Sequence, residues 1–236
     1  MATLSFYPTH HITTGEGGAV MINRSRFSRI ARSIRDWGRD CWCAPGVSNT
    51  CGKRFGWKLG DLPFGYDHKY VFSHIGYNFK PTDMQASIGS IQIQRIQAFE
   101  EARRRNFQRL RDGLAPLEEF LLMPKVHPKA DPAWFGFPLT VRKGVDRGKL
   151  IGWLEQARIV TRQVFAGNIL RQEAFQGVTH RVHGDLRQTD RVMTDSFFVG
   201  VYPGLTDEMI DFMIKRFVDF FATRRRRRVA VPASSV

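Results

Sequence analysis

The stretch from Gly38 to His74 constrains the fold more than any other part of the sequence. It contains glycines at close intervals and all three cysteines of the chain, and its apolar residues show no clear periodicity. Loops of this length without secondary structure are uncommon in a compact domain and are usually functional. The sequence therefore predicts a long loop that its own contacts or a bound cofactor keep ordered.

The three cysteines in this loop favour metal or redox chemistry. Cys41, Cys43 and Cys51 form a Cys-x-Cys-x(7)-Cys pattern, and three thiols cannot make a fully paired disulfide framework. Thiolates at this spacing suit zinc or an iron–sulfur cluster, and either centre needs a fourth ligand. The spacing alone does not choose between the two metals.

Two short strands are predicted before the loop, at residues 2–8 and 19–22, joined by a glycine-rich turn. An isolated two-stranded hairpin is marginally stable at best in water, so this pair needs a larger sheet to join. A helix is predicted over residues 25–37, with Ser25 as its N-cap and apolar residues at helical spacing.

The sequence after the loop has an α+β pattern. From Pro81, apolar residues at helical spacing predict one long helix with room for a single break, ending before Pro116. Strands are expected over 134–141, 160–164 and 197–201, and helices over 147–157, near 189–194 and over 207–221. Thr206, Asp207 and Glu208 mark the start of the last helix.

The chain is strongly basic, with 36 Lys and Arg against 22 Asp and Glu and a formal net charge of +14. Part of the excess comes from the run Arg224–Arg228, which we expect to lie in a solvated tail. A nucleic-acid-binding protein is one interpretation, but the basic residues do not alternate with aromatics in a recognisable module. The charge is also compatible with an enzyme that binds phosphorylated ligands.

Membrane insertion and secretion find no support in the sequence. No stretch approaches the roughly 18 apolar residues that cross a bilayer. The first residues lack a basic region followed by an apolar one, which a signal peptide requires. We therefore expect a cytoplasmic protein.

The N-terminal hairpin carries a motif that resembles a known family. Ser5-Phe6-Tyr7-Pro8-Thr9-His10, followed by Gly17-Gly18, offers hydroxyl groups for a phosphate and a histidine that can move protons near neutral pH. It resembles the Ser-Phe-x-x-x-Lys and Gly-Gly motif of the DegT/DnrJ/EryC1/StrS aminotransferase family. In that family the lysine binds pyridoxal phosphate covalently. Here His10 stands at the position of the lysine.

The histidine changes the chemistry that the resemblance implies. Histidine can transfer a proton but cannot hold the cofactor covalently, which leaves free pyridoxamine phosphate and favours dehydration over transamination. Together with the cysteines, the sequence resembles the family's branch of CDP-6-deoxy-L-threo-D-glycero-4-hexulose 3-dehydrases. These pair pyridoxamine phosphate with a 2Fe-2S cluster in lipopolysaccharide sugar synthesis. The branch takes a CDP-linked 4-keto-6-deoxyhexose, with electrons from an NADH-dependent flavin and iron–sulfur reductase, and yields a 3,6-dideoxy sugar nucleotide.

The resemblance extends through Gly65–Tyr70 and Gly76–Ala86 to about residue 222, and it implies roles for individual residues. His10 is the catalytic proton carrier, with Tyr7 assisting it, and Ser5 contacts the cofactor phosphate. Asn78 reaches the phosphate of the neighbouring subunit's cofactor, which implies a homodimer. The implied iron ligands are Cys41, Cys43 and Cys51. Arg162 is a further candidate for the substrate phosphate because its planar guanidinium donates two parallel hydrogen bonds.

The implied fold is α/β, the C-terminal part of a fold-type I aminotransferase-like enzyme. We expect five segments. Residues 1–35 are a remnant of the cofactor domain, 36–75 are the iron–sulfur loop, 76–115 are a connecting helix, 116–223 are a C-terminal α+β domain, and 224–236 are a basic disordered tail. Complete members of the family are longer. The fourth cluster cysteine and the remaining cofactor contacts are therefore expected upstream, and the chain is expected to be truncated and inactive alone.

Three alternatives remain open from the residues. One is an iron-free 3-dehydrase that also uses histidine, another is a family member that acts as a sugar aminotransferase-like protein, and the third is the basic nucleic-acid-binding protein. The cysteines argue against the iron-free enzyme. The other histidines, His11, His68 and His74, are expected to be packed or solvent-facing rather than ligands.

Overall fold

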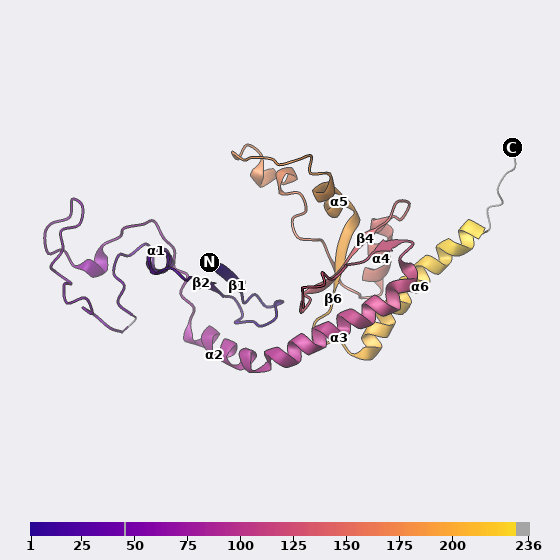
Figure 1. The fold of residues 1–236 in the computed structure, drawn as a ribbon, viewed down its shortest axis with the longest axis horizontal. Helices are drawn as coiled ribbons and strands as arrows, with labels where there is room; N and C mark the ends of the chain where they lie inside the picture. The colour runs from indigo at the N-terminus through magenta and orange to yellow at the C-terminus, as the bar shows by residue number, and fades with distance from the viewer. Residues whose placement is uncertain (45, 230–236) are drawn as a thin grey trace. The chain divides into compact units, whose positions relative to one another are not determined.

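The structure is a computed structural model that describes residues 1–44 and 46–229, with side chains described for 1–44 and 46–222. The chain forms two compact units, Met1–Gln94 and Arg95–Val236 (Figure 1). The boundary between them falls inside the segment predicted as one long helix. No helix among the described residues is long and apolar enough to cross a membrane.

The first unit begins with a two-stranded antiparallel hairpin. Strand β1 (Ala2–Ser5) pairs with β2 (Gly18–Met21), so that Ser5 lies opposite Gly18. Most of its residues are exposed, as expected for a hairpin with no further strand beside it in the described chain. Both predicted strands are confirmed, each within a few residues.

Helix α1 (Ser25–Arg35) follows the hairpin, and α2 (Asp83–Gln92) closes the unit. The predicted N-cap of α1 is wrong, because Arg24 occupies the cap position with an extended backbone and Ser25 is the first helical residue. Helix α2 has a capping box instead. The Thr82 side chain accepts the Gln85 backbone N–H, and the Gln85 side chain accepts the Thr82 N–H at 2.8 Å.

Between α1 and α2 the described residues contain one short 3-10 helix, η1 (His68–Tyr70), and two isolated β-bridges. The bridges join Asp36 to Asn78 and Arg39 to Phe72, and they close the neck of the cysteine loop. The predicted long loop without regular structure is confirmed. It is ordered by contacts at its neck and inside it rather than by periodic secondary structure.

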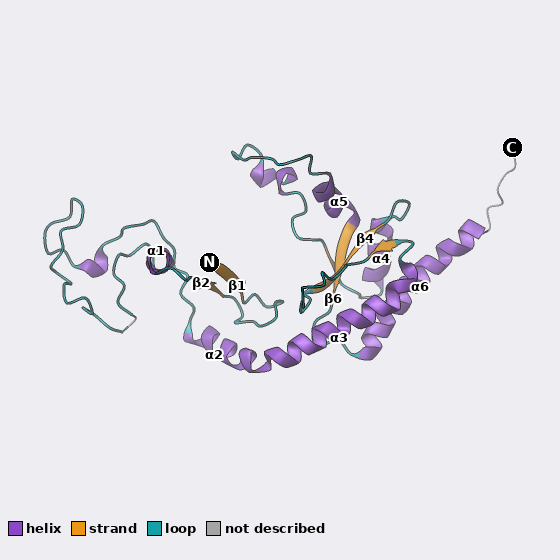
Figure 2. Cartoon of the chain, viewed as in Figure 1, coloured by secondary structure: helices purple, strands orange, loops and turns teal. Residues whose placement is uncertain are grey.

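The second unit is a four-stranded antiparallel sheet with helices against one face (Figure 2). The strand order is β3 (Leu121–Leu122), β4 (Gly136–Val141), β6 (Ser196–Gly200) and β5 (Thr161–Arg162). Alternate residues of the two central strands, such as Phe137 and Val199, are fully buried. They pack with residues of α3 (Ile96–Leu114), α4 (Arg147–Gln156) and α6 (Asp207–Val229), among them Leu110, Leu154 and Phe217.

The predicted elements of this unit are largely confirmed. The long helix is interrupted once, by the 3-10 turn η2 (Ile93–Arg95), and α6 begins at Asp207, where Thr206 accepts the Met209 N–H. Strand β3 was not predicted. Helix α6 also continues through Val229, so the backbone of the expected disordered tail is helical up to that residue, in keeping with the helix propensity of arginine. Residues 230–236 of that tail lie outside the described residues.

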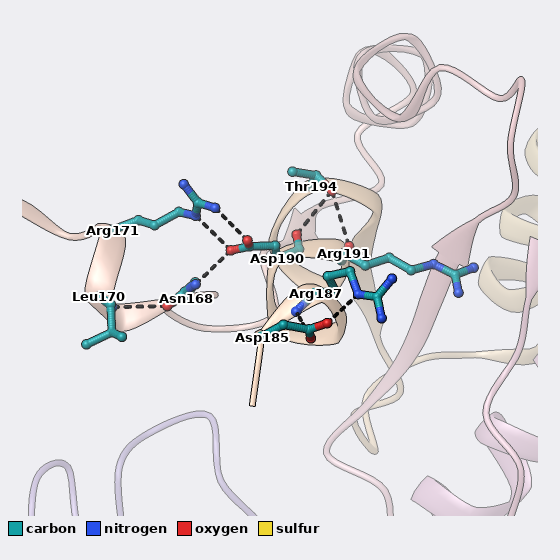
Figure 3. Close-up of polar contacts among 8 residues, drawn as sticks. All are labelled: Asn168, Leu170, Arg171, Asp185, Arg187, Asp190, Arg191 and Thr194. Atoms are coloured by element: carbon teal, nitrogen blue, oxygen red, sulfur yellow. Dashed lines mark hydrogen bonds and ion pairs between the residues drawn. The ribbon is translucent and has the colours of Figure 1, made fainter. Parts of the chain in front are cut away.

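A polar network ties the loop after β5 to α5 (Arg187–Asp195) (Figure 3). Asn168 is 5% exposed, and its amide donates to Asp190 Oδ1 at 2.7 Å while its carbonyl oxygen accepts the Leu170 N–H at 3.1 Å. Arg171 donates to both oxygens of the same carboxylate, at 2.7 and 2.5 Å. These hydrogen bonds hold the pKa of Asp190 at about 2, with that from Arg171 the larger cause.

Replacing Asp190 by asparagine is expected to loosen this loop at neutral pH and to remove its acid sensitivity. Because the folded pKa is about 2 and the ordinary value is 3.8, the stabilisation is fully present above pH 3.8 and is lost as the pH falls through 2. Hydrogen exchange at the Leu170 amide as a function of pH measures this. Asp185→Asn is the matched control, since Asp185 pairs only with the exposed Arg187 in Figure 3. Equal effects of the two substitutions would contradict the prediction.

Candidate functional site

The hairpin turn brings Ser5, Tyr7 and His10 together. Two backbone hydrogen bonds close the turn, from the Phe6 N–H to the Gly17 oxygen and from the Thr14 N–H to the Phe6 oxygen. His10 Nδ1 lies 3.3 Å from the Ser5 carbonyl oxygen, and its ring meets that of Tyr7 edge to face, with centroids 5.7 Å apart. The three residues predicted from the motif therefore share one small site.

The contact with Ser5 selects the tautomer of His10. A carbonyl oxygen only accepts hydrogen bonds, so Nδ1 carries the proton and Nε2 is the basic nitrogen of the neutral ring. The Ser5 hydroxyl oxygen accepts the Tyr7 N–H at 3.3 Å, which fixes its position beside the histidine. This arrangement places the His10 imidazole and the Ser5 hydroxyl group side by side in a turn made largely of exposed residues.

The turn is fastened from both sides. Gly18 lies so close to β1 that an added Cβ would stand 2.8 Å from the Leu4 carbonyl oxygen, so a side chain there would push the strands apart. The Gln85 side chain donates to the Glu16 carbonyl oxygen at 3.1 Å, and so does the hydroxyl of Thr14, at 2.7 Å. The N-terminus of α2 thus supports the histidine turn. The Thr82 and Gln85 capping pair predicts the start of a helix but gives little indication of this contact.

The three cysteines are unpaired and half-buried, and only Cys41 and Cys43 contact each other among the described interactions. The Cys43 Sγ lies 3.0 Å from the Thr50 hydroxyl, and that hydrogen bond is the main cause that lowers the pKa of Cys43. Cys41 interacts with Cys43, and its pKa is raised chiefly by burial. Cys51 Sγ instead accepts the Lys53 N–H at 3.4 Å. Across the described side chains, no three His, Cys, Asp or Glu residues form a group arranged to hold a metal ion.

A cavity of about 510 Å³ opens beside Cys41 and Cys43. Its walls contain more positive than negative side chains: Arg32, Arg35, Arg39, Lys69 and Lys80, against Asp36. Positive charge of this kind favours thiolates and other anions. The cavity therefore suits an anionic group next to the two thiols, and it was not predicted because its cations come from separate parts of the sequence.

The neck of the cysteine loop is built on a close approach of two glycines. A Cβ added to Gly38 would stand 1.7 Å from the His74 carbonyl oxygen, and one added to Gly76 would stand 2.3 Å from the Gly38 nitrogen. Trp37 has a left-handed φ of 57° there and donates its N–H to the Tyr77 oxygen at 2.8 Å. This crossing places Asn78 opposite Asp36, at the neck of the cysteine loop.

Replacing Gly38 by alanine is expected to destabilise the neck by about 3 kcal/mol, from backbone strain at positive φ plus the collision with His74. Hydrogen exchange at the Trp37 and Gly38 amides reports the loss. Gly52→Ala is the matched control, because Gly52 also has positive φ but has nothing within 4 Å of an added Cβ. It should cost about 1 kcal/mol. Equal costs would show that the close approach does not matter.

The buried centre of the loop is His68, which is 3% exposed. Its Nε2 lies 3.2 Å from Asp40 Oδ2, and its ring contacts those of Trp42 and Trp57. Arg54 and Asp67 pair alongside, and the hydrogen bond from Arg54 lowers the pKa of Asp67 to about 2. His68 is therefore a packed residue, one of the two environments expected from the sequence. The sequence did not indicate that it lies at the centre of the loop.

The remaining candidates have contacts of their own. His74 Nδ1 contacts the Ser33 hydroxyl at 3.1 Å, at the end of α1. Arg162 lies on β5 in the second unit and is exposed, with one guanidinium N–H donated to the Thr161 carbonyl oxygen at 3.1 Å. Asn78 is exposed at the neck.

Comparison with known proteins gives a consistent result. Residues 1–218 match the model of the DegT/DnrJ/EryC1/StrS aminotransferase family. The chain is 53% identical over 223 residues to the lipopolysaccharide biosynthesis protein RfbH of Salmonella typhimurium. This match covers 94% of this chain and 51% of that protein. It is 52% identical over 224 residues to the dTDP-4-dehydro-2,6-dideoxy-D-glucose 3-dehydratase of Saccharopolyspora spinosa, covering 94% and 48%. The chain thus spans about half the length of the curated relatives it matches.

The fold also matches a solved structure. Escherichia coli GDP-4-keto-6-deoxy-D-mannose-3-dehydratase with bound hydrated PLP superposes with a TM-score of 0.74 at 25% identity, over 91% of this chain and 53% of that one. The predicted fold class, the C-terminal part of an aminotransferase-like α/β fold, is therefore confirmed.

Proposed function

The chain belongs to the DegT/DnrJ/EryC1/StrS aminotransferase family, and we propose that it carries the proton-transferring histidine of a pyridoxamine-phosphate-dependent nucleotide-sugar 3-dehydrase. The observation that carries this proposal is His10, held by the Ser5 carbonyl oxygen with Nε2 as its basic nitrogen. The substrate is a nucleotide-linked 4-keto-6-deoxyhexose, and the pathway is cytoplasmic dideoxyhexose synthesis for lipopolysaccharide. The names of the Salmonella and Saccharopolyspora relatives support this assignment.

Each residue of the hairpin site has a role in the proposal. Bound pyridoxamine phosphate supplies the electron sink that allows the hydroxyl at carbon 3 to leave. His10 Nε2 takes a proton next to the bound cofactor. The Tyr7 ring contacts the imidazole and keeps the histidine in place. The Ser5 hydroxyl donates to the cofactor phosphate. The exposed turn fits a phosphorylated ligand because its hydroxyl and backbone groups are accessible.

Two further contacts complete the site. Asn78, exposed at the neck, donates to the cofactor phosphate of a neighbouring subunit, so the active enzyme is a homodimer. Arg162 binds a phosphate of the substrate. Both side chains are exposed, so each can reach a ligand.

The cysteine loop is proposed to hold a 2Fe-2S cluster that relays electrons from an NADH-dependent flavin and iron–sulfur reductase. The adjacent thiols of Cys41 and Cys43 support this proposal because thiolates bind iron, and the positive cavity beside them favours an anionic cluster. Cys51 stands apart in this structure, and the described residues form no complete ligand set. Cluster binding therefore requires Cys51 to move toward the pair and a fourth ligand to join.

An iron-free 3-dehydrase is the second candidate function. The observation that favours it is the absence of a three-ligand group among the described residues. The two candidates share His10 and differ in the use of the cysteines and in the reductive step that follows dehydration.

The mode of cofactor binding tests the proposal. For this test the chain is joined to the part of the Salmonella relative that it does not cover, which gives the joined enzyme. We expect the folded joined enzyme to retain pyridoxamine phosphate and to release it on gel filtration in denaturant. Borohydride should trap no adduct at residue 10. A trapped adduct on any lysine of this chain would contradict the assignment of His10.

A further inference from the structure

The positive cavity beside the cysteine loop contains more cations than its own carboxylate can neutralise. Lys80 pairs with Asp36 at 2.6 Å, and Asp36 is the only carboxylate among the described residues of the wall. The other cations of the wall form no ion pair with a described carboxylate: Arg32, Arg35, Arg39 and Lys69. Because like charges held close together repel, an anionic ligand in this cavity is favoured.

Arg39 gives a second, independent sign that a ligand belongs in the cavity. Its guanidinium carbon lies 4.9 Å from the centre of the Trp37 ring, and this contact holds the side chain in the wall. Its Nε is buried and has no hydrogen-bond partner among the described residues. A buried N–H without an acceptor costs free energy. A carboxylate oxygen is a strong acceptor for a guanidinium N–H, so a ligand with carboxylates would remove this cost.

Two neighbouring thiols, those of Cys41 and Cys43, line the same cavity. Both are half-buried and unpaired, and their side chains interact with each other. The ring of Trp42, between them in sequence, contacts that of the buried His68 with centroids 5.4 Å apart, which anchors this part of the loop. Lys69 interacts electrostatically with the Cys41 sulfur. An anion attracted by the cations therefore comes to lie beside two thiols.

We propose that the iron-free chain exchanges these two thiols with a small disulfide that carries carboxylates, for which glutathione disulfide is the probe. The carboxylates of such a ligand match the unpaired cations of the wall. A cavity of about 510 Å³ also lies in the size range of small-molecule sites. The inference concerns a covalent modification of Cys41 and Cys43 and does not rest on the proposed function.

The exchange has two steps and passes through a mixed disulfide. Cys43, the less buried of the two cysteines, attacks one sulfur of glutathione disulfide, and the S–S bond of the reagent breaks. The first glutathione leaves as a thiol with the proton of Cys43. Cys41 then attacks the mixed disulfide, and the second glutathione leaves with the proton of Cys41. The cysteines are oxidised to one disulfide and the reagent is reduced to two thiols.

The charge preference of the exchange tests the inference on the purified chain, after a chelator has removed any iron and the thiols have been reduced. Glutathione disulfide, which is negatively charged at neutral pH, is compared with cystamine, a positively charged disulfide. Each rate is divided by the rate of the same chain in denaturant, which removes the intrinsic reactivity of the reagent. Glutathione disulfide should then react about tenfold faster than cystamine, and added salt should reduce this preference.

Mass spectrometry of the products identifies the thiols that react. We expect a disulfide between Cys41 and Cys43. Cys41→Ser should stop the reaction at a stable glutathione adduct on Cys43, because the second attacking thiol is missing. A first product that joins Cys51 to either cysteine would overturn the inference, and so would the absence of any exchange.

Arg35→Gln removes one cation of the wall, so it should slow exchange with glutathione disulfide several-fold and speed exchange with cystamine. Arg29→Gln is the matched control, because Arg29 is exposed on the same helix, α1, and is not part of the wall. It should leave both rates unchanged, and both variants should keep the circular dichroism of the unsubstituted chain. Equal effects of the two substitutions, or no charge preference in the unsubstituted chain, would overturn the role of the cavity.

Discussion

Replacing His10 by lysine is expected to lower dehydration by the joined enzyme about a hundredfold to ten-thousandfold, and to create a covalent attachment site for pyridoxal phosphate. A lysine amine attacks the cofactor aldehyde, whereas an imidazole does not. The lysine also lacks the ring nitrogen pair that lets His10 bond to the Ser5 carbonyl oxygen and still present a base. Turnover and borohydride trapping, read on the same preparation, measure both effects.

His11→Lys is the matched control for this substitution. It places the same amine one residue further along, where the motif assigns no chemistry, and it should neither trap the cofactor nor reduce dehydration. If the two variants behave alike, His10 is not the proton carrier and the account of the hairpin site is wrong.

Replacing Cys43 by serine is expected to remove nearly all iron from the joined enzyme while dehydration continues. Thiolates hold iron–sulfur clusters, and a serine hydroxyl is a poor substitute. The reductive step should therefore stop, because electrons from the reductase no longer reach the dehydrated sugar. Iron analysis, visible absorbance and reductase-coupled turnover together separate this outcome from unfolding.

Thr50→Val supplies the control for the cysteine. Its hydroxyl contacts the Cys43 sulfur at 3.0 Å, so the variant removes that hydrogen bond but leaves all three thiols. Iron content should stay near that of the unsubstituted enzyme. Iron-free protein before any substitution, with dehydration intact, would instead favour the iron-free 3-dehydrase.

Local patterns predicted most of the second unit. The helical spacing after Pro81 and the cap at Thr206 gave α3 and the start of α6, and runs of buried apolar residues gave β4 and β6. Strand β3 was missed because two residues, Leu121 and Leu122, show no period and pair only through the tertiary fold. The Ser25 cap failed because Arg24 holds the extended backbone that begins α1.

The candidate site was predictable only in part, because much of it depends on contacts between distant parts of the sequence. Ser5, Tyr7 and His10 lie within one turn, so the sequence motif placed them together. The neck depends on Gly38 meeting Gly76, and the positive cavity draws cations from α1 and from both sides of the loop. The buried position of Asn168 depends on Asp190, which lies on a different helix. None of these contacts leaves a periodic signal in the sequence.

The fate of an isotopic oxygen label at carbon 3 of the nucleotide-linked 4-keto-6-deoxyhexose tests the central claim most directly. The joined enzyme is incubated with this sugar and pyridoxamine phosphate, without reductase, and the sugar is analysed by mass spectrometry. If His10 serves a 3-dehydrase, the label is lost to water, and His10→Lys prevents the loss. Retention of the label at carbon 3, with or without an amino group gained at carbon 4, would contradict the account.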